Sequence, residues 1–290
     1  MTSREGTLAR AAVSSVAASS VAALLCACGS PPAPVAMTFG VLDAACTPER
    51  IAAERAAGIT AVELPMAWDR YEPAPGEVDA DYVAEVRRKI ETCRAAGMRI
   101  VLGPGLQYPP VWVRALPDAL LRGSAGNTPA HGGLDLVFNA AVRGAVHVYL
   151  GRLADDLPLG DVAAVRIGVS GTGELAYPGP DDGTAVDADP GPGRSAHEYW
   201  AFGVAPQTGT GLADGAAVTP MPDWVPGQRV WRGALVTPEQ ADAWLRWYSG
   251  ALLDTVVWQV GRLREVGFTG DVHVPVAGRG ILPADRTAAV

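Results

Sequence analysis

The sequence has 290 residues, a formal net charge of -8 and 49% hydrophobic residues. That is enough apolar material for one large domain or two small ones, and it excludes a disordered chain. The acidic balance argues against a nucleic-acid partner, because phosphate binding needs clustered Lys or Arg. The four His and four Cys show neither a CxxC nor an HExxH spacing, so we expect no metal site, and nothing implies a cofactor.

The first 28 residues are typical of a bacterial export signal. Arg4 and Arg10 flank the start of an apolar run of about 15 residues that ends at Leu25, which is short for a membrane span and typical of a secretory signal. Leu25-Cys26-Ala27-Cys28 resembles the lipobox, which implies cleavage before Cys28 and lipidation of its thiol; a plain secretory signal is the alternative. We expect a signal peptide at 1–28, a Pro-rich tether at 29–36, and an exported cell-surface lipoprotein or extracellular protein that meets the membrane only through its lipid anchor.

Short apolar segments and amphipathic segments alternate along the rest of the chain. Strands are expected at 37–42, 60–64, 99–102, 162–169 and 271–276, and helices at 47–58, 79–97, 137–153 and 237–267. This alternation is typical of a parallel sheet covered by helices, either closed into a (β/α)8 barrel or open and doubly wound. The open alternative lacks a dinucleotide-binding turn, because Gly103-Pro104-Gly105 is followed by Tyr108 where a third glycine is needed.

Residues 178–236 break this alternation with a segment rich in Gly, Pro, Asp and Thr. Insertions of this length in a compact domain are functional or disordered. The segment contains several aromatic residues that argue against disorder: Tyr199, Trp200, Phe202, Trp224 and Trp231. In the helix that follows, Trp244, Trp247 and Tyr248 have the spacing of a core-facing stripe.

The segment from Arg166 to Pro178 is the most informative about chemistry. A predicted strand ends in a glycine-rich turn that carries Glu174. A carboxyl group at the C-terminal end of a barrel strand can protonate a glycosidic oxygen. A loop Glu bonded to backbone amides is an equally weighted alternative. The same turn nearly matches a nucleophile elbow, but Thr172 stands at its last glycine position.

Three motifs in chain order resemble those of clan A barrel glycosidases. Residues 68–79 read W-x-x-x-E-P-x-P-G-x-x-D, which is similar to the segment after the clan's second strand. Residues 106–112 resemble the strand-three loop, and 173–178 resemble the acid-bearing turn of β-amylases and of family 42 β-galactosidase-like proteins. The resemblance implies an α/β (β/α)8 barrel, Glu174 as general acid/base, and an oligosaccharide, polysaccharide or glycoside substrate. Gly173 stands where the clan usually has an Asn that binds the sugar 2-hydroxyl, although the β-amylase-like turn also lacks that Asn.

Aromatic and polar residues near the predicted strand ends are candidates for substrate binding. Aromatic faces stack on the apolar faces of pyranose rings, which suggests sugar platforms at Trp68, Tyr108, Trp112 and Tyr177. Core packing is the alternative for all four, and it carries equal weight for Trp68 and Trp112. Further candidate ligands are Asp43, which can equally cap a helix, together with Gln107 and Arg279. We expect Glu72 to be structural, paired with a nearby Arg or backbone amides, and His273 to be a core residue more readily than a site residue.

The predicted barrel has too few strands to close. A glycosidase needs a second carboxylate, roughly 5 Å from the first or somewhat farther, and in clan A it comes from a later strand. We therefore expect residues 37–290 to form an incomplete barrel with about five βα units, from a C-terminally truncated copy of a longer enzyme. The expected function is that of an exported, β-galactosidase-like glycoside hydrolase; the alternative is a non-catalytic saccharide-binding surface lipoprotein.

Two cysteines remain in the predicted fold, Cys46 and Cys93. They form a disulfide or remain two buried thiols.

Overall fold

The computed structural model describes residues 38–129, 133–169, 171, 173–178 and 199–276. The predicted signal peptide and tether, with Cys28, and the C-terminal residues after 276, with Arg279, lie outside these ranges. The elements follow one another in this order: β1 (Gly40–Val41), α1 (Pro48–Ala56), β2 (Ala61–Pro65), α2 (Trp68–Tyr71), α3 (Ala80–Ala95), β3 (Arg99–Gly103), α4 (Val111–Arg114), α5 (Ala140–Asp156), the 3-10 turn η1 (Leu159–Asp161), β4 (Ala164–Arg166), α6 (Val204–Thr208), β5 (Val230–Trp231), β6 (Ala234–Leu235), α7 (Pro238–Glu265) and β7 (Asp271–His273).

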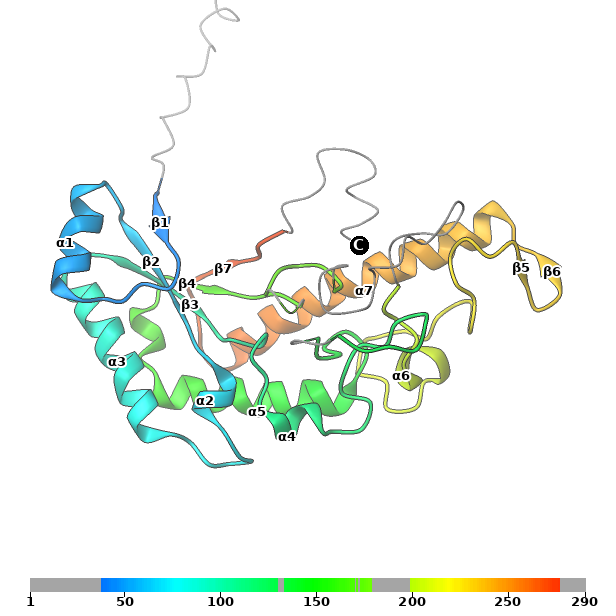
Figure 1. Cartoon of the computed structure of the whole chain (residues 1–290), viewed down its shortest axis with the longest axis horizontal. Coiled ribbons are helices and arrows are strands. Elements are labelled where there is room, and N and C mark those ends of the chain that lie inside the picture. The colour runs from blue at the N-terminus through cyan, green and yellow to red at the C-terminus, as the bar shows by residue number, and fades with distance from the viewer. Residues whose placement is uncertain (1–37, 130–132, 170, 172, 179–198, 277–290) are drawn as a thin grey trace, which may run out of the picture. The chain divides into compact units, whose positions relative to one another are not determined.

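The main sheet has five strands in the order β1-β2-β3-β4-β7, and each neighbouring pair is parallel (Figure 1). Each of the five predicted strands is therefore confirmed: β1, β4 and β7 are shorter than predicted, β2 is shifted by one residue, and β3 is one residue longer. A doubly wound sheet reverses its strand order at a switch point, whereas the described strands follow the chain order without reversal. The sheet has the order of a barrel-type α/β fold.

Side chains alternate between the two faces of this sheet. Val62, Leu64, Ile100, Leu102 and Val165 lie on one face and are buried. They belong to a single hydrophobic cluster, the sheet core, to which α1, α3 and α5 contribute Ile51, Val83, Val86, Ile90, Val142, Val146, Leu150 and Leu153. The helices thus cover this face. The opposite face carries the alternate residues, among them Glu63, Val101 and Arg166.

The helix N-termini follow the capping signals of the sequence. Thr47 and Asp79 accept hydrogen bonds from Arg50 N and Tyr82 N, and Thr237 forms a capping box with Gln240. The predicted start of α5 at Val137 is wrong by three residues. Asp135 accepts a hydrogen bond of 2.7 Å from Phe138 N and holds these residues in a turn, so that Asn139 becomes the cap.

The described part of the insertion folds into a second cluster, which we call the aromatic core. It combines Trp200, Ala201, Ala205, Met221 and Trp224 with residues of α7 and with Leu121, Val137, Phe138, Val169 and Tyr177. Trp244 and Tyr248 of α7 are buried, and Trp247 packs on Phe138 and donates its Nε1–H to Ala217 O. The prediction that this α7 stripe is core is confirmed.

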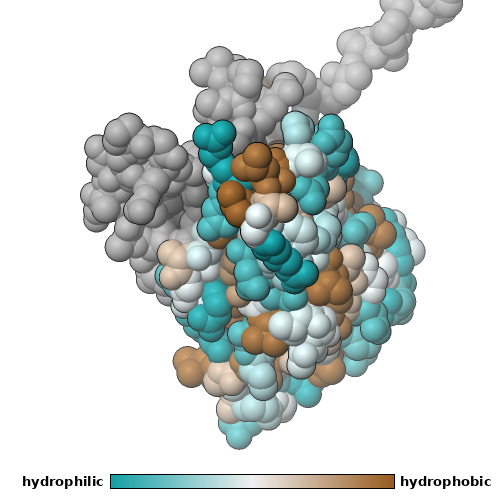
Figure 2. Space-filling model, turned by 90° about the vertical axis from the view of Figure 1, so that its right-hand side faces the viewer, coloured by the Kyte–Doolittle hydropathy of each residue, from teal (hydrophilic) through white to brown (hydrophobic). Residues whose placement is uncertain are grey.

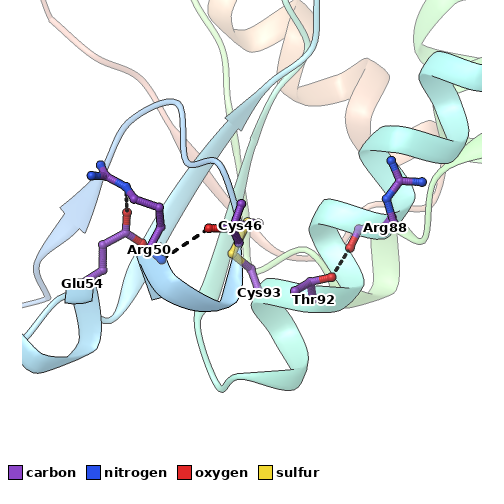
Figure 3. The surroundings of a disulfide bond; sticks show 7 residues. Cys46, Arg50, Glu54, Arg88, Thr92 and Cys93 are labelled. Atoms are coloured by element: carbon purple, nitrogen blue, oxygen red, sulfur yellow. Dashed lines mark hydrogen bonds and ion pairs between the residues drawn. A yellow bond between two sulfur atoms is a disulfide. The ribbon is translucent and has the colours of Figure 1, made fainter. Parts of the chain in front are cut away.

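Cys46 and Cys93 form a disulfide with a Cα–Cα distance of 5.4 Å. Cys46 lies in the loop before α1 and Cys93 lies in the last turn of α3 (Figure 3). Both residues are buried in the sheet core. The bond therefore links the first βα unit to the second.

No helix of the described ranges, not even the 28-residue α7, is long and apolar enough to cross a bilayer.

Candidate active site

Glu174 lies at the C-terminal edge of the sheet, on a turn that follows β4. The backbone closes this turn through a hydrogen bond from Val169 N to Glu174 O of 2.8 Å. On its other side the turn is tied to the chain after β7, because Leu175 N donates to Pro275 O at 2.8 Å. Glu174 itself is half-buried. Its carboxyl group is thus carried by a segment that is fixed at both ends.

Two glycines explain why this turn can be so tight. A Cβ at Gly168 would lie 2.1 Å from Gly173 O, so no side chain fits where the two backbones meet. Gly173 has a φ of +76°, in the left-handed region that glycine adopts without steric cost. The glycine-rich sequence before Glu174 is therefore a geometric requirement of the turn.

Polar groups from three strands gather around Gly173. The position that a Cβ would occupy on Gly173 lies 3.3 Å from the Gln107 carboxamide and 3.4 Å from Arg166 Nη2. Arg166, the last residue of β4, pairs with Glu63 of β2 through Nη1 and Oε1 at 2.9 Å. We call Glu63, Gln107, Arg166 and Glu174 the polar cluster. Of its members, Gln107 and Glu174 were predicted from the sequence.

The predictions from sequence did not include Glu63 and Arg166. Both were visible as single charges inside apolar strands, Ala61–Pro65 and Ala164–Arg166. Charges in such strands are costly unless they are paired. That signal marks each residue but does not identify the partner.

Asp43 and Tyr108 lie beside a cavity of about 170 Å³ at the ends of β1 and β2. The same cavity is lined by Arg70, Lys89 and the residues that follow β2. Tyr108 is 48% exposed, so its ring is open to solvent. Asp43 is exposed and has a φ of +52°. The structure therefore brings these two predicted substrate ligands together.

Trp68 is fully buried, so its ring is not open to a sugar. It stacks on Tyr149 with ring centroids 4.4 Å apart and meets Trp112 edge-on at 6.1 Å. Trp112 is half-buried and donates its Nε1–H to Glu72 O at 3.1 Å. Both tryptophans pack against other side chains of the sheet core, and we leave them out of the proposed site.

Glu72 holds the loop after α2 together. One carboxylate oxygen pairs with Arg152 and accepts a hydrogen bond from Gly76 N at 2.8 Å, and the other accepts from Trp68 Nε1 at 3.3 Å. Glu72 is 1% exposed. The prediction that it is structural, paired with an Arg and a backbone amide, is confirmed.

Tyr177 belongs to the aromatic core. Its ring stacks on Tyr248 at 4.0 Å, and its hydroxyl donates to Tyr248 O at 3.0 Å. Burial raises the pKa of Tyr177 well above its usual value, with smaller contributions from Tyr248 and Asp135. The hydroxyl is a neutral core donor, and we leave Tyr177 out of the proposed site as well.

Asp135 is a buried carboxyl group near this stacked pair. Burial raises its pKa to about 7, and Asp118 adds to the increase, while hydrogen bonds from Phe138 N and Val137 N and the charge of Arg143 oppose it. Arg143 is itself buried and donates to Leu136 O and Val137 O. Asp135 therefore titrates near neutral pH inside the fold.

His273 does not take the core position expected for it. It lies on β7 opposite Arg166 in the parallel register and is exposed. Within the described ranges, no three His, Cys, Asp or Glu side chains form a group that could hold a metal ion.

A second groove lies between the β5–β6 hairpin and the start of α7. Its lining includes Tyr199, Trp224, Leu235 and Leu245, and none of the candidate substrate residues. Figure 2 views the molecule from this side, where apolar and polar side chains are interspersed. Leu235 and Leu245 are 72% and 41% exposed.

Comparison with known proteins agrees with the resemblance. Residues 42–142 match the model of glycoside hydrolase family 42, described as Beta-galactosidase. This segment includes the W-x-x-x-E-P motif and the strand-three loop, so the predicted resemblance to that family is confirmed over it. No curated protein sequence matches the chain.

Solved structures of related folds differ in how much of the chain they share. The catalytic domain of β-amylase from Paenibacillus polymyxa has a TM-score of 0.55 at 14% identity, over 82% of this chain and 65% of the amylase domain. β-Galactosidases from a psychrophilic Marinomonas and from Halorubrum lacusprofundi match at 20% and 23% identity, with TM-scores of 0.38 and 0.37, over 45% of this chain in each case. The chain covers only 21% of the length of either β-galactosidase. The amylase match shows that the described sheet and helices have a barrel-like α/β fold.

Proposed function

We propose that this chain carries the acid-bearing part of a glycoside hydrolase, with Glu174 as the general acid/base. The observation that carries the proposal is the place of Glu174: on a glycine-closed turn at the C-terminal edge of a parallel sheet, directly after Gly173, next to which the Gln107 amide lies. A carboxyl group fixed in such a position can give its proton to the leaving oxygen of a glycoside. The match of residues 42–142 to the β-galactosidase family favours a β-galactoside as substrate.

Substrate contacts are assigned to residues that remain accessible. Gln107 offers a carboxamide next to the turn, and Tyr108 offers an exposed ring face beside Asp43. A carboxamide donates and accepts hydrogen bonds at once, which suits a sugar hydroxyl. We propose these three residues as the saccharide contacts, with Arg279 as a further candidate.

The test compares the full chain with Glu174→Gln on a panel of 4-methylumbelliferyl glycosides that begins with the β-galactoside. If the chain lacks its second carboxylate, as the expected truncation implies, it should not turn over on its own. If it contains that carboxylate, we expect turnover and a loss of about 10²–10⁴-fold in the variant, the usual contribution of a positioned acid. Glu91→Gln, on the exposed surface of α3, is the matched control and should leave the rate unchanged. Absence of turnover on every glycoside would refute the proposal that this chain is an active enzyme on its own.

Saccharide binding is measured separately on Glu174→Gln. Removing the acid should leave binding intact whether or not the chain is an enzyme. Binding by both proteins without turnover by either would establish the alternative, a non-catalytic saccharide-binding protein.

We further propose that the chain is exported and lipidated at Cys28. Metabolic labelling with a radioactive fatty acid should mark the full chain but not Cys28→Ser. Equal labelling of both, or labelling of neither, would contradict lipidation at this thiol.

A further inference from the structure

The polar cluster contains an ion pair whose place in the fold calls for an explanation beyond stability. Glu63 and Arg166 are only 12% and 19% exposed in their side chains. Withdrawing two charges from water costs free energy that their attraction only partly returns, and replacing such a pair with apolar residues is often neutral or stabilising. The sheet could therefore be built without this pair.

The position of the pair connects it to the acid. Glu63 lies on β2 and Arg166 on β4, so the pair crosses β3, and Glu63 Oε1 lies 3.6 Å from the Cβ position of Gly103 at the end of that strand. The other terminal nitrogen of the guanidinium, Nη2, lies 3.4 Å from the Cβ position of Gly173. One end of Arg166 thus pairs with Glu63, and the other lies next to the open side of Gly173, the residue that precedes Glu174.

We propose that Arg166, held by Glu63, is a positioning residue for the acid. The planar guanidinium supports the turn at Gly173 and so fixes where the Glu174 carboxyl group lies relative to the glycosidic oxygen. A lysine cannot replace it fully, because an ammonium group on a flexible stem lacks the fixed fork that can face Glu63 and the turn at once. Proton transfer demands accurate placement, and an error of 1 Å can reduce a rate about 100-fold.

This proposal rests on the proposed function and predicts a dependence on the leaving group. A 4-methoxyphenyl glycoside needs a proton on its leaving oxygen, whereas a 2,4-dinitrophenyl glycoside departs without one. Misplacing the acid should therefore slow cleavage of the 4-methoxyphenyl glycoside and leave cleavage of the 2,4-dinitrophenyl glycoside nearly unchanged. A general loss of folding or of saccharide binding would slow both.

The experiment uses Arg166→Lys and the double variant Glu63→Leu/Arg166→Met in the full chain. The double variant removes both members of the pair together, so neither Glu63 nor Arg166 is left as a buried charge without the other, and we expect it to keep the fold. For both variants we expect kcat/KM on the 4-methoxyphenyl glycoside to fall, about 100-fold in the double variant and less in Arg166→Lys. On the 2,4-dinitrophenyl glycoside the kcat/KM of both variants should stay within about threefold of that of the unmodified chain, because kcat/KM reports the step in which the leaving group departs.

A matched control is available on the same sheet. Arg99 and Asp271 form an ion pair of 3.6 Å that crosses β4 at the strand starts, away from the turn, with side chains 54% and 71% exposed. Arg99→Met should leave both rates unchanged.

The outcomes separate the two proposals. If the unmodified chain cleaves neither substrate, the proposed function fails and this inference fails with it. Suppose that Glu174→Gln shows the leaving-group dependence. If the double variant then slows cleavage of both substrates equally, or slows cleavage of neither, only the positioning role is overturned.

Discussion

Trp68 and Tyr149 stack face to face across 4.4 Å and join the loop after β2 to helix α5. The indole of Trp68 also donates to Glu72, which pairs with Arg152 of α5. The W-x-x-x-E-P motif therefore fastens a loop to a helix about 80 positions later in the chain. The tryptophan and the carboxylate of this motif are therefore structural residues.

Removing the Glu72 carboxylate should destabilise the protein strongly. Glu72→Ala leaves the Gly76 amide, the Trp68 indole and the Arg152 guanidinium without their buried acceptor, and we expect a loss of about 3 kcal/mol in the free energy of unfolding. Denaturant titration measures it. Glu85→Gln is the control, because Glu85 pairs with Lys89 and Arg70 on the surface and should cost less than about 1 kcal/mol. Equal effects would contradict the role of Glu72.

Gly105 and Gly97 provide a matched pair of substitutions by Ala. Both have positive φ, +71° and +78°, but a Cβ on Gly105 would lie 1.9 Å from Met66 O, whereas a Cβ on Gly97 meets no atom within 4 Å. We expect Gly97→Ala to cost about 1 kcal/mol for its backbone conformation alone. Gly105→Ala should cost at least about 3 kcal/mol, because the backbone after β2 must move. A smaller loss for Gly105→Ala than for Gly97→Ala in thermal unfolding would refute the close approach.

Reduction of the Cys46–Cys93 disulfide should lower stability. The bond closes a segment with a sequence separation of 47, for which the chain-entropy relation gives about 4 kcal/mol. We expect the denaturation midpoint to fall on addition of a reductant. The double variant Cys46→Ala/Cys93→Ala should start low and show no response. A midpoint of the unmodified chain that is insensitive to reductant would argue against the bond.

Asp135 should make stability depend on pH near neutrality. Its pKa is raised to about 7 in the folded protein, above its value of about 3.9 in an unfolded chain. The folded state then binds the proton more tightly between these values, so the free energy of unfolding falls as the pH rises from about 4 to about 7. Asp135→Asn keeps an acceptor for Phe138 N and removes the titration. As the pH rises from about 4 to about 7, the free energy of unfolding of the variant should increase relative to that of the unmodified chain by up to about 1.4 kcal/mol per pH unit. Parallel curves for the two proteins would contradict the shifted pKa.

Local signals in the sequence predicted the sheet and the helix starts well. Thr47, Asp79 and Thr237 begin helices through hydrogen bonds to amides three residues later, so the information lies within one turn of chain. The start of α5 was misplaced because an apolar pattern does not show the hydrogen bond from Phe138 N to Asp135, which holds Val137 and Phe138 in a turn before the cap at Asn139.

The candidate site was only partly predictable, because its contacts join distant segments. Tyr177 is an aromatic residue of the type that stacks on sugars, but its burial depends on Tyr248, 71 positions away. Glu63 and Arg166 are 103 positions apart, and their pairing follows from the parallel register of β2, β3 and β4. Glu174 was identified because the glycines beside it constrain the backbone locally.

Helix α7 belongs to both hydrophobic cores. Trp244 and Tyr248, in its first half, pack in the aromatic core, and Leu263, near its end, packs in the sheet core. The chain after β4 joins the same two clusters, with Ile167 in one and Val169 in the other. Neither core can melt without breaking this shared helix, so the two should unfold in a single cooperative transition. The Glu174 turn lies at the junction of the two cores. A large-to-small substitution among the tryptophans of the aromatic core should therefore increase the amide hydrogen exchange of that turn.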